Sequence, residues 1–339
     1  MPMRSNKKIA VVIPCYRVSR HIKEVILSIP AFVDHILVVD DACPEYSGAI
    51  ADEIGEQRVR VIFHEKNKGV GGAVISGFLK AVELGCDIVI KMDGDGQMDA
   101  NQIPILILPL LAEQADYTKG NRFHDFTALK SMPKIRLLGN SVLSFVVKAT
   151  SGYWNLMDPT NGFCAISYPA LCELKLDKID KGYFFETDML IHLNLINKVV
   201  MDVPIAAIYG NEISNLRIRN VLFSFAIKAW KGLLKRIFYK YYIYDFNMAS
   251  IYFLIAIPLL VFGLAFGGYR WNMGILENSE NNAGTIMLAA LPIILGIQFL
   301  LQAINIDISS IPKKSADSYR SDHIMSFANK KRSEKSFSS

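Results

Sequence analysis

Short runs of β-branched and other apolar residues alternate with amphipathic segments of helical period up to about residue 200. This alternation predicts an α/β sheet, parallel at least in its first half, with helices on both faces. In such a sheet ligands bind at the carboxyl ends of the strands, where Tyr16, Asp41 and Asp93 fall. The predicted strands are Ile9–Ile13, Ile36–Asp40, Val59–Phe63, Ile88–Met92, Tyr117–Gly120, Phe163–Ser167 and Val199–Val203. The predicted helices are Ser19–Ser28, Ser47–Glu56, Gly71–Leu84, Ile103–Glu113, Lys134–Thr150 and Thr187–Asn197.

The pattern changes after Ser214, where a basic amphipathic segment begins. Such a helix suits a bilayer surface, with apolar side chains in the acyl boundary and lysines at lipid phosphates. A solvated helix that packs on the globular domain would show the same pattern, and this alternative stays open. Apolar or aromatic side chains recur at positions 222, 226, 230, 233, 237 and 241, whereas Lys228, Lys231, Lys235 and Lys240 occupy other faces.

Two long uncharged stretches follow, Phe246–Tyr269 and Asn281–Ile306. Each exceeds the about 20 residues that cross the hydrocarbon core of a bilayer, and the proline inside each is tolerated in such a helix. We therefore predict two transmembrane helices. Small residues such as Gly263 and Gly267 permit helix association, which is compatible with a homo-oligomer.

The basic residues predict the orientation of this pair. The connection between the two stretches holds one basic residue, Arg270, whereas both outer flanks carry several lysines and arginines. The positive-inside rule therefore places the globular domain and both termini in the cytoplasm, with a bacterial inner membrane as the expected location. The predicted parts are a cytoplasmic domain over 1–217, juxtamembrane helices over 218–246, two transmembrane helices with a short external loop over 247–308, and a disordered tail over 309–339.

Composition narrows the class of protein. The chain is 51% hydrophobic and 20% charged, which is apolar for a soluble enzyme. The formal charge of +5 is modest and the basic residues concentrate after about residue 217, so we expect a surface partner there and no nucleic acid. The five cysteines and six histidines show no metal-ligand spacing, which favours reduced cysteines in the cytosol. The apolar run behind the N-terminus ends at Pro14, too early for a signal peptide.

The strongest chemical signal is the segment Lys91–Gln97, KMDGDGQ. A predicted strand ends here at Asp93 and Asp95, and the glycines Gly94 and Gly96 let the chain bend around a bound ion. Carboxylate oxygens suit Mg²⁺ or Mn²⁺ shared with a diphosphate, and the ion would neutralise charge on a departing nucleotide diphosphate. Acidic turns with glycine are common, so this motif alone is weak evidence.

Two earlier strands end in residues that suit a nucleotide. Asp41 could accept a hydrogen bond from a base or ribose, and Tyr16 could flank the base. A turn-capping aspartate and an exposed turn tyrosine are equally open alternatives. The segment Asn67–Gly72 is rich in glycine and precedes a helix, but it fits neither common phosphate-binding loop pattern. We expect its glycines to permit a tight turn and close packing.

Six motifs in order are Pro14-x-Tyr16, Val38-Val39-Asp40-Asp41, Asn67-x-Gly69-x-Gly71, Asp93-x-Asp95-x-Gln97, Gly120-Asn121-Arg122 and Asp158-Pro159-Thr160-Asn161-Gly162-Phe163. Together they resemble the family 2 inverting glycosyltransferases of GT-A fold, most closely the dolichyl-phosphate-mannose synthase and polyprenyl-phosphate glucosyltransferase branch. The resemblance covers roughly residues 7–217. It implies a Rossmann-like nucleotide-sugar-binding domain, and the two uncharged stretches fit the membrane-anchored members.

The resemblance implies a metal-dependent, inverting transfer of a hexose. The donor would be a nucleotide-sugar of the UDP-glucose or GDP-mannose type, and the acceptor a polyprenyl phosphate (undecaprenyl or dolichyl) at the cytoplasmic membrane face. The implied contacts to the nucleotide-sugar are Pro14, Tyr16, Asp41, Asp93, Arg122 and Arg136, and the implied metal ligands are Asp93, Asp95 and Gln97. The implied lipid-phosphate residues are Ser214, Arg217 and Arg219, for which a solvated basic face is the alternative.

The acids Glu186 and Asp188 lie where related inverting enzymes carry an acidic pair facing the acceptor. Two acids one residue apart at a helix start diverge, so we expect one of them to face the site, with Asp188 as the candidate base; complementation of the helix dipole is the alternative. A phosphate monoester has a second pKa near ~6 and needs little proton abstraction. Positioning and charge neutralisation should therefore matter more, and the predicted catalytic residues are Asp95, Asp188 and, on the acceptor side, Asp158.

The sequence departs from the family at three places. Arg17 stands where the family often has Asn, Ala42-Cys43 replaces the usual Gly-Ser, and Asn140 stands where related enzymes often have Ser. The first two leave the details of base and ribose recognition open, but not the metal site.

Two other functions compete with this interpretation. A glycosyltransferase that extends a saccharide would carry a QxxRW motif, but Gly267 stands at the Gln position before Arg270-Trp271. A non-catalytic membrane adaptor that binds nucleotide-sugars is the second alternative, and the intact set of Asp93, Asp95 and Gln97 argues against it.

Overall fold

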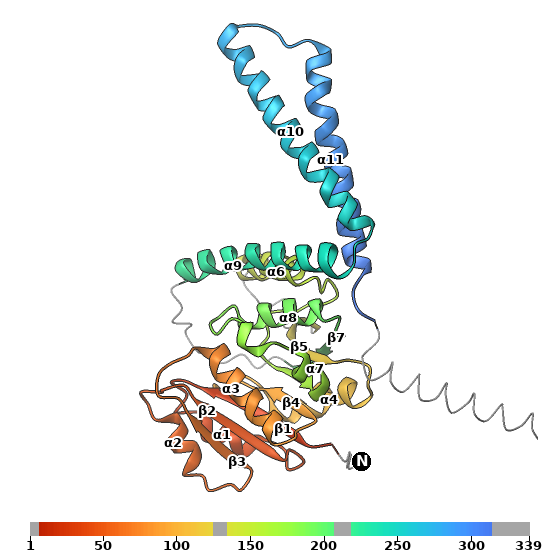
Figure 1. Cartoon of the computed structure of the whole chain (residues 1–339). Helices are drawn as coiled ribbons and strands as arrows, with labels where there is room; N and C mark the ends of the chain where they lie inside the picture. Colours follow the sequence, from red (N-terminus) through yellow and green to blue (C-terminus); the bar gives the residue numbers. More distant parts are fainter. Residues whose placement is uncertain (1–6, 125–133, 207–217, 314–339) are drawn as a thin grey trace, which may run out of the picture. The chain divides into compact units, whose positions relative to one another are not determined.

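The computed structural model describes residues 7–124, 134–206 and 218–313. It divides into two compact units, one built mainly from residues up to Leu233 and the other from Leu234–Ile311. The first unit contains a seven-stranded sheet of order β3-β2-β1-β4-β6-β5-β7 (Figure 1), which confirms the α/β class. The strands are β1 (Ile9–Cys15), β2 (His35–Asp40), β3 (Val59–Phe63), β4 (Ile88–Lys91), β5 (Tyr117–Asn121), β6 (Cys164–Ser167) and β7 (Val200–Pro204).

The seven predicted strands are all present, with ends within two residues of the prediction. β1 to β4 run parallel, as predicted for the first half of the sheet. β6 is antiparallel to both of its neighbours, β4 and β5, and β7 is parallel to β5. The central strands are buried on both faces, which explains their continuous apolar sequences.

Helices cover both faces of the sheet (Figure 1). One face packs on α1 (Ile22–Ser28), α2 (Ser47–Asp52) and α4 (Ile103–Leu111) through a continuous apolar core. On the other face, α3 (Val70–Glu83) packs on β1 and β2 and also contacts α7 (Tyr168–Glu173) and α8 (Phe185–Leu195). The predicted helices are present, whereas α7, a helix of six residues, was not predicted.

The topology brings several chain segments to one edge of the sheet. β1 lies between β2 and β4, so the strand order reverses direction at β1. In α/β sheets a ligand-binding crevice forms at the carboxyl ends of the strands beside such a reversal. Because β6 is antiparallel, its first residue, Cys164, pairs with Lys91 and Lys119 near the carboxyl ends of β4 and β5. The residues before β6 therefore reach the same edge as Asp93 and Arg122.

α9 (Ile218–Phe238) packs against α8 and α6 (Lys134–Ser151). Phe225 and Ala229 supply its inward face, so the helix is apolar on more than one side. Of the predicted apolar row, Trp230 is exposed, Leu233 and Ile237 are half-buried, and Tyr241, which follows the helix, is buried. The exposed apolar row of α9 is Phe223, Ile227, Trp230, Leu234 and Phe238.

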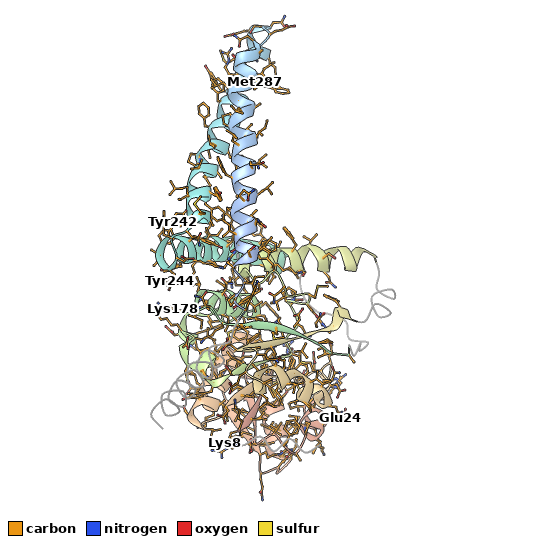
Figure 2. The ribbon with its side chains drawn as sticks, turned by 90° about the vertical axis from the view of Figure 1, so that its right-hand side faces the viewer. Lys8, Glu24, Lys178, Tyr242, Tyr244 and Met287 are labelled. Atoms are coloured by element: carbon orange, nitrogen blue, oxygen red, sulfur yellow. The ribbon has the colours of Figure 1, made fainter. Side chains whose placement is uncertain are left out.

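The second unit contains the two predicted apolar helices, α10 (Met248–Glu277) and α11 (Ala283–Ser309). By length and composition, both are long and apolar enough to cross a membrane. Their side chains stand out from the ribbon in Figure 2, where Met287 of α11 is labelled; this residue is 58% exposed. Exposed apolar side chains on this scale suit a lipid environment.

Small residues and ion pairs to Asp307, from Arg236 and Lys240, stabilise this unit. A Cβ at Gly263 would lie 2.6 Å from Ile293, so this glycine permits close packing of α10 on α11, and the homo-oligomer stays a prediction. Arg236 and Asp307 form a buried pair with N···O distances of 2.7 and 2.9 Å.

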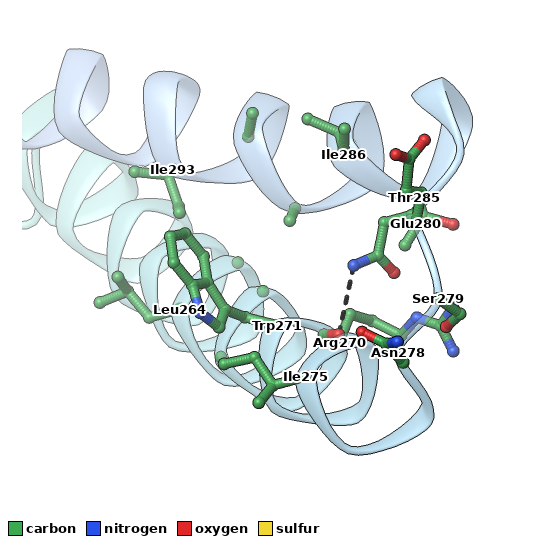
Figure 3. Close-up of a pocket in the computed structure, with 17 residues that line it drawn as sticks. Leu264, Arg270, Trp271, Ile275, Asn278, Ser279, Glu280, Thr285, Ile286 and Ile293 are labelled. Carbon is green, nitrogen blue, oxygen red and sulfur yellow. Dashed lines mark hydrogen bonds between the residues drawn. The ribbon is translucent and has the colours of Figure 1, made fainter.

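Between the helices, toward their connection, lies a hollow of about 1210 Å³ whose lining includes Trp271 (Figure 3). Its lining includes no predicted site residue.

Candidate functional site

Asp93 and Asp95 follow β4 in a turn at the sheet edge described above. Asp95 accepts a hydrogen bond from the Gln97 N–H at 3.0 Å, and Gly96 has φ +79°, a left-handed conformation that favours glycine. The Asp93 N–H contacts the Met98 sulfur at 3.2 Å, which fixes the start of the turn. Both carboxylates are partly exposed, so they are accessible to a ligand.

The donor set at this turn fits a hard divalent cation. Mg²⁺ is commonly bound through one or two carboxylates together with substrate phosphates and water. Within the described ranges, no three His, Cys, Asp or Glu side chains gather into a group that could hold a metal by themselves. Asp93 and Asp95, with Gln97 exposed beside them, therefore suit an ion whose remaining ligands come from a diphosphate or water. Gly162, in the segment before β6, lies close to the turn. A Cβ at this position would lie 2.7 Å from Oδ2 of Asp93, so a larger side chain would displace that carboxylate.

Asp41 is buried at the end of β2 and organises the next loop. Its two oxygens accept from the N–H groups of Lys68 and Gly69, each at 2.8 Å, and one of them lies 2.7 Å from Nδ1 of His64. A Cβ at Gly69 would lie 2.5 Å from the carbonyl oxygen of Lys181, which agrees with the packing role expected of this glycine-rich segment. The contact of Asp41 with a base or ribose stays a prediction.

The two family departures near the predicted nucleotide end of the site have a backbone consequence. Arg17 has φ +59° and Ala42 has φ +54°, both left-handed. Asn and Gly, the residues that the family often has there, enter this region more readily than Arg and Ala. The Arg17 guanidinium lies over the ring of Tyr16, 5.4 Å from its centroid, and Tyr16 is 45% exposed. Tyr16, which lies two residues after Pro14, is thus accessible to a ligand.

Arg122 and Asp158 form an ion pair at the carboxyl end of β5, which β6 separates from β4 in the sheet. Arg122 Nε donates to Asp158 Oδ2 at 2.7 Å and Nη2 to Oδ1 at 3.2 Å. Asp158 is fully buried, whereas the Arg122 side chain is 38% exposed. The segment that follows Asp158 is bonded to β5, because the Asn161 side chain donates to the carbonyl oxygen of Gly120 at 2.8 Å. The predicted sites at Arg122 and Asp158 are therefore one unit in which the carboxylate orients the guanidinium.

Glu186 and Asp188 point to different partners, as expected for acids one residue apart at a helix start. Asp188 accepts from the Asp180 N–H at 2.8 Å and so supports the loop before α8. Glu186 accepts from Lys91 at 3.1 Å, and Lys91 also pairs with Asp93 at 2.8 Å. Glu186 is therefore the acid connected to the carboxylate turn, although the sequence singled out Asp188, whose catalytic role stays a prediction.

Several predicted residues are beyond what the structure describes. Ser214 and Arg217 lie outside the described residues, and so do the side chains of Arg136 and Arg219. Asn140 of α6 lines a hollow of about 360 Å³ together with Lys148, and Phe123 and Met157, the neighbours of Arg122 and Asp158, complete part of its wall. A hollow with a mostly apolar wall and a few polar side chains therefore lies next to the chain neighbours of the Arg122–Asp158 pair.

Asp202 of β7 was not singled out from the sequence. Its carboxylate accepts a hydrogen bond from the Met157 N–H, and Oδ1 is buried with no hydrogen-bond partner among the described residues. Burial raises the pKa of Asp202 from 3.8 to about 6, and the negative charge of Asp158 adds to the rise. The sequence around Asp202 does not indicate this rise in pKa, because the rise depends on burial in the folded structure.

We expect Asp202→Asn to stabilise the fold at neutral pH. The folded state holds the Asp202 proton more tightly than the unfolded chain, so wild-type stability falls relative to the variant as the pH rises from about 4 to about 6. The rise in pKa corresponds to at most about 3 kcal/mol. Thermal unfolding of both proteins across this range should show Tm values that coincide near about pH 4 and differ above about pH 6. A constant difference at all pH values, or the same result for the exposed control Asp52→Asn, would contradict the assignment.

Comparisons with known proteins agree with this arrangement. The model of the family described as Glycosyl transferase family 2 matches residues 10–174. The UDP-N-acetylglucosamine--dolichyl-phosphate N-acetylglucosaminyltransferase of Methanococcus voltae is 33% identical over 66% of this chain and 94% of its own length. The undecaprenyl-phosphate mannosyltransferase of Micrococcus luteus is 33% identical over 50% of this chain and 70% of its own.

A solved structure shares the fold. Glucosyl-3-phosphoglycerate synthase from Mycobacterium tuberculosis, in complex with Mn²⁺, uridine diphosphate and phosphoglyceric acid, has a TM-score of 0.50 at 20% identity. The similarity covers 68% of this chain and 78% of that one.

Proposed function

Because the chain belongs to glycosyl transferase family 2, we propose that this glycosyltransferase transfers a sugar from a nucleotide-sugar to a polyprenyl phosphate. The observation that carries the proposal is the joint placement of the Asp93–Asp95 turn and the Arg122–Asp158 pair at one sheet edge. The first offers carboxylates for a cation and diphosphate, and the second offers a guanidinium for a phosphate. The named relatives that act on dolichyl and undecaprenyl phosphate support the acceptor class.

The reaction requires one bond exchange. An oxygen of the acceptor phosphate forms a bond to the anomeric carbon of the sugar, and the bond from that carbon to the nucleotide diphosphate breaks. The acceptor phosphate is mostly a dianion at neutral pH, so little proton abstraction is needed. A Mg²⁺ or Mn²⁺ ion at Asp93 and Asp95 would supply neutralisation of the leaving diphosphate, and the Mn²⁺ and uridine diphosphate in the glucosyl-3-phosphoglycerate synthase support this choice.

The sequence assigned Arg122 to the nucleotide-sugar, and we propose instead that Arg122 serves the acceptor side of the site. Its guanidinium is oriented by the buried Asp158. The chain neighbours of the pair, Phe123 and Met157, line the hollow that contains Asn140 and Lys148. A phosphate head in this hollow would meet cationic and hydrogen-bonding groups. Ser214, Arg217 and Arg219 remain proposed contacts to that phosphate, and Arg136 remains a proposed contact to the nucleotide-sugar. We further propose that α10 and α11 cross the bilayer. The globular domain would occupy 1–217, and the basic flanks support a cytoplasmic location for this domain and both termini.

The proposal is tested with the full chain in lipid nanodiscs and Mn²⁺. Radiolabelled UDP-glucose, UDP-N-acetylglucosamine and GDP-mannose are each incubated with undecaprenyl or dolichyl phosphate, and lipid-linked product is separated from water-soluble label. One donor should give a chloroform-soluble product that requires the divalent ion. Transfer only to a saccharide, or no transfer with any donor, would exclude the proposed acceptor.

A further inference from the structure

Lys91 is a lysine buried at the end of an apolar strand. Its side chain is 1% exposed, and Nζ lies 2.8 Å from Oδ1 of Asp93 and 3.1 Å from Oε1 of Glu186. Two carboxylates at these distances favour the charged form of the lysine although it is buried. A buried ammonium is costly unless it is paired, so this lysine and the two carboxylates form one charged cluster.

The walls of the cluster leave the ammonium little freedom. Cys164 pairs with Lys91 across the β4–β6 register. A Cβ at Gly162 would lie 2.5 Å from Lys91 Nζ and 2.7 Å from Oδ2 of Asp93, so that position excludes any larger side chain unless its neighbours move. The contact with Lys91 engages Oδ1, which fixes the orientation of the Asp93 carboxylate.

We propose that Lys91 is a positioning residue for Asp93 and that Glu186 balances its charge, so that the Asp93–Asp95 turn keeps two net negative charges for a divalent cation. The charge balance carries the second half of the proposal. Without Glu186, Lys91 would neutralise Asp93, and the turn would offer a single net charge from Asp95. With Glu186 present, the pair Lys91–Glu186 sums to zero. The inference rests on the proposed function, because it assumes a cation–diphosphate site at this turn.

Charge and geometry can be separated by three variants. Glu186→Gln keeps an acceptor for Lys91 but removes one negative charge, so we expect Mn²⁺ affinity to weaken about tenfold while kcat at saturating Mn²⁺ changes little. Lys91→Met removes the anchor and leaves an extra negative charge, so Mn²⁺ should bind at least as tightly while kcat falls about 10- to 100-fold. In the double variant the charge is restored, so affinity should return toward wild type and kcat should stay low.

The measurements are Mn²⁺ binding in the presence of UDP by electron paramagnetic resonance, kcat of transfer, and Tm, all on the full chain. Glu83→Gln, an exposed glutamate paired with Lys80, is the matched control and should match wild type. If affinity and kcat change together in proportion to Tm, or if the double variant regains kcat, the proposal is wrong. Should Lys91→Met fail to fold, Glu186→Gln alone decides, since unchanged Mn²⁺ affinity in that variant overturns the proposal. Failure of wild type to bind Mn²⁺ with UDP would instead count against the proposed function itself.

Discussion

Asp95→Asn is expected to lower kcat of sugar transfer by on the order of 10²–10³-fold. Asparagine has the size of aspartate and can still accept from the Gln97 N–H, so the turn should keep its shape. The change removes one of the two carboxylates available to a cation, and with it part of the neutralisation of the departing diphosphate. The rate of transfer at saturating donor, acceptor and Mn²⁺ measures this loss, and the Tm should stay within a few degrees of wild type.

Asp188→Ala provides the comparison for this variant. Asp188 supports the Asp180 backbone, and a dianionic acceptor needs little help from a base, so we expect a smaller loss of rate than for Asp95→Asn. The exposed Asp52→Asn should retain full activity. An inactive Asp188→Ala beside an active Asp95→Asn would overturn the proposed mechanism and restore a general base as the main requirement.

The fold was largely readable because its strands are short apolar runs bounded by turns. Val59–Phe63 was predicted with both ends correct, and the antiparallel direction of β6 was not predicted, because direction depends on which strands become neighbours. α7 was missed because a helix of six residues shows no clear period by itself, whereas α2, which is equally short, was predicted as part of the longer segment Ser47–Glu56. The sequence did not identify the inward face of α9, because the helix is apolar on more than one side and only its packing on α8 and α6 distinguishes them.

The candidate site was predicted in outline but not in its supporting contacts. Asp93, Asp95 and Arg122 belong to sequence motifs, and the strand ends identified their common edge. The partners that orient them come from distant segments: Asp158 lies 36 residues from Arg122 and Glu186 lies 95 residues from Lys91. A signal did exist for Lys91, because a charged residue at the end of the buried run Ile88–Lys91 requires a counter-charge. The position of that counter-charge depends on the tertiary structure.

The second large effect is expected at the Arg122–Asp158 pair, and it should be asymmetric. Arg122→Met leaves a fully buried carboxylate without its guanidinium partner, which should reduce the free energy of unfolding by about 2–3 kcal/mol. Asp158→Asn leaves the Arg122 guanidinium without its carboxylate partner, but this guanidinium already reaches solvent. The variant should therefore lose only about 1 kcal/mol of stability. Both variants should lower the rate of transfer by about 10²-fold, because the guanidinium is absent in one and misoriented in the other.

The coupling between the two residues distinguishes orientation from independent roles. If Asp158 acts by orienting Arg122, then Asp158→Asn should have little further effect on the rate once Arg122 is methionine, and a double-mutant cycle should show strong coupling. The KM for polyprenyl phosphate should rise more than the KM for the nucleotide-sugar, because the neighbours of the pair, Phe123 and Met157, line the hollow that we propose for the acceptor. Additive losses of rate, or a rise confined to the donor KM, would move Arg122 to the donor side of the site and leave Asp158 with a separate role.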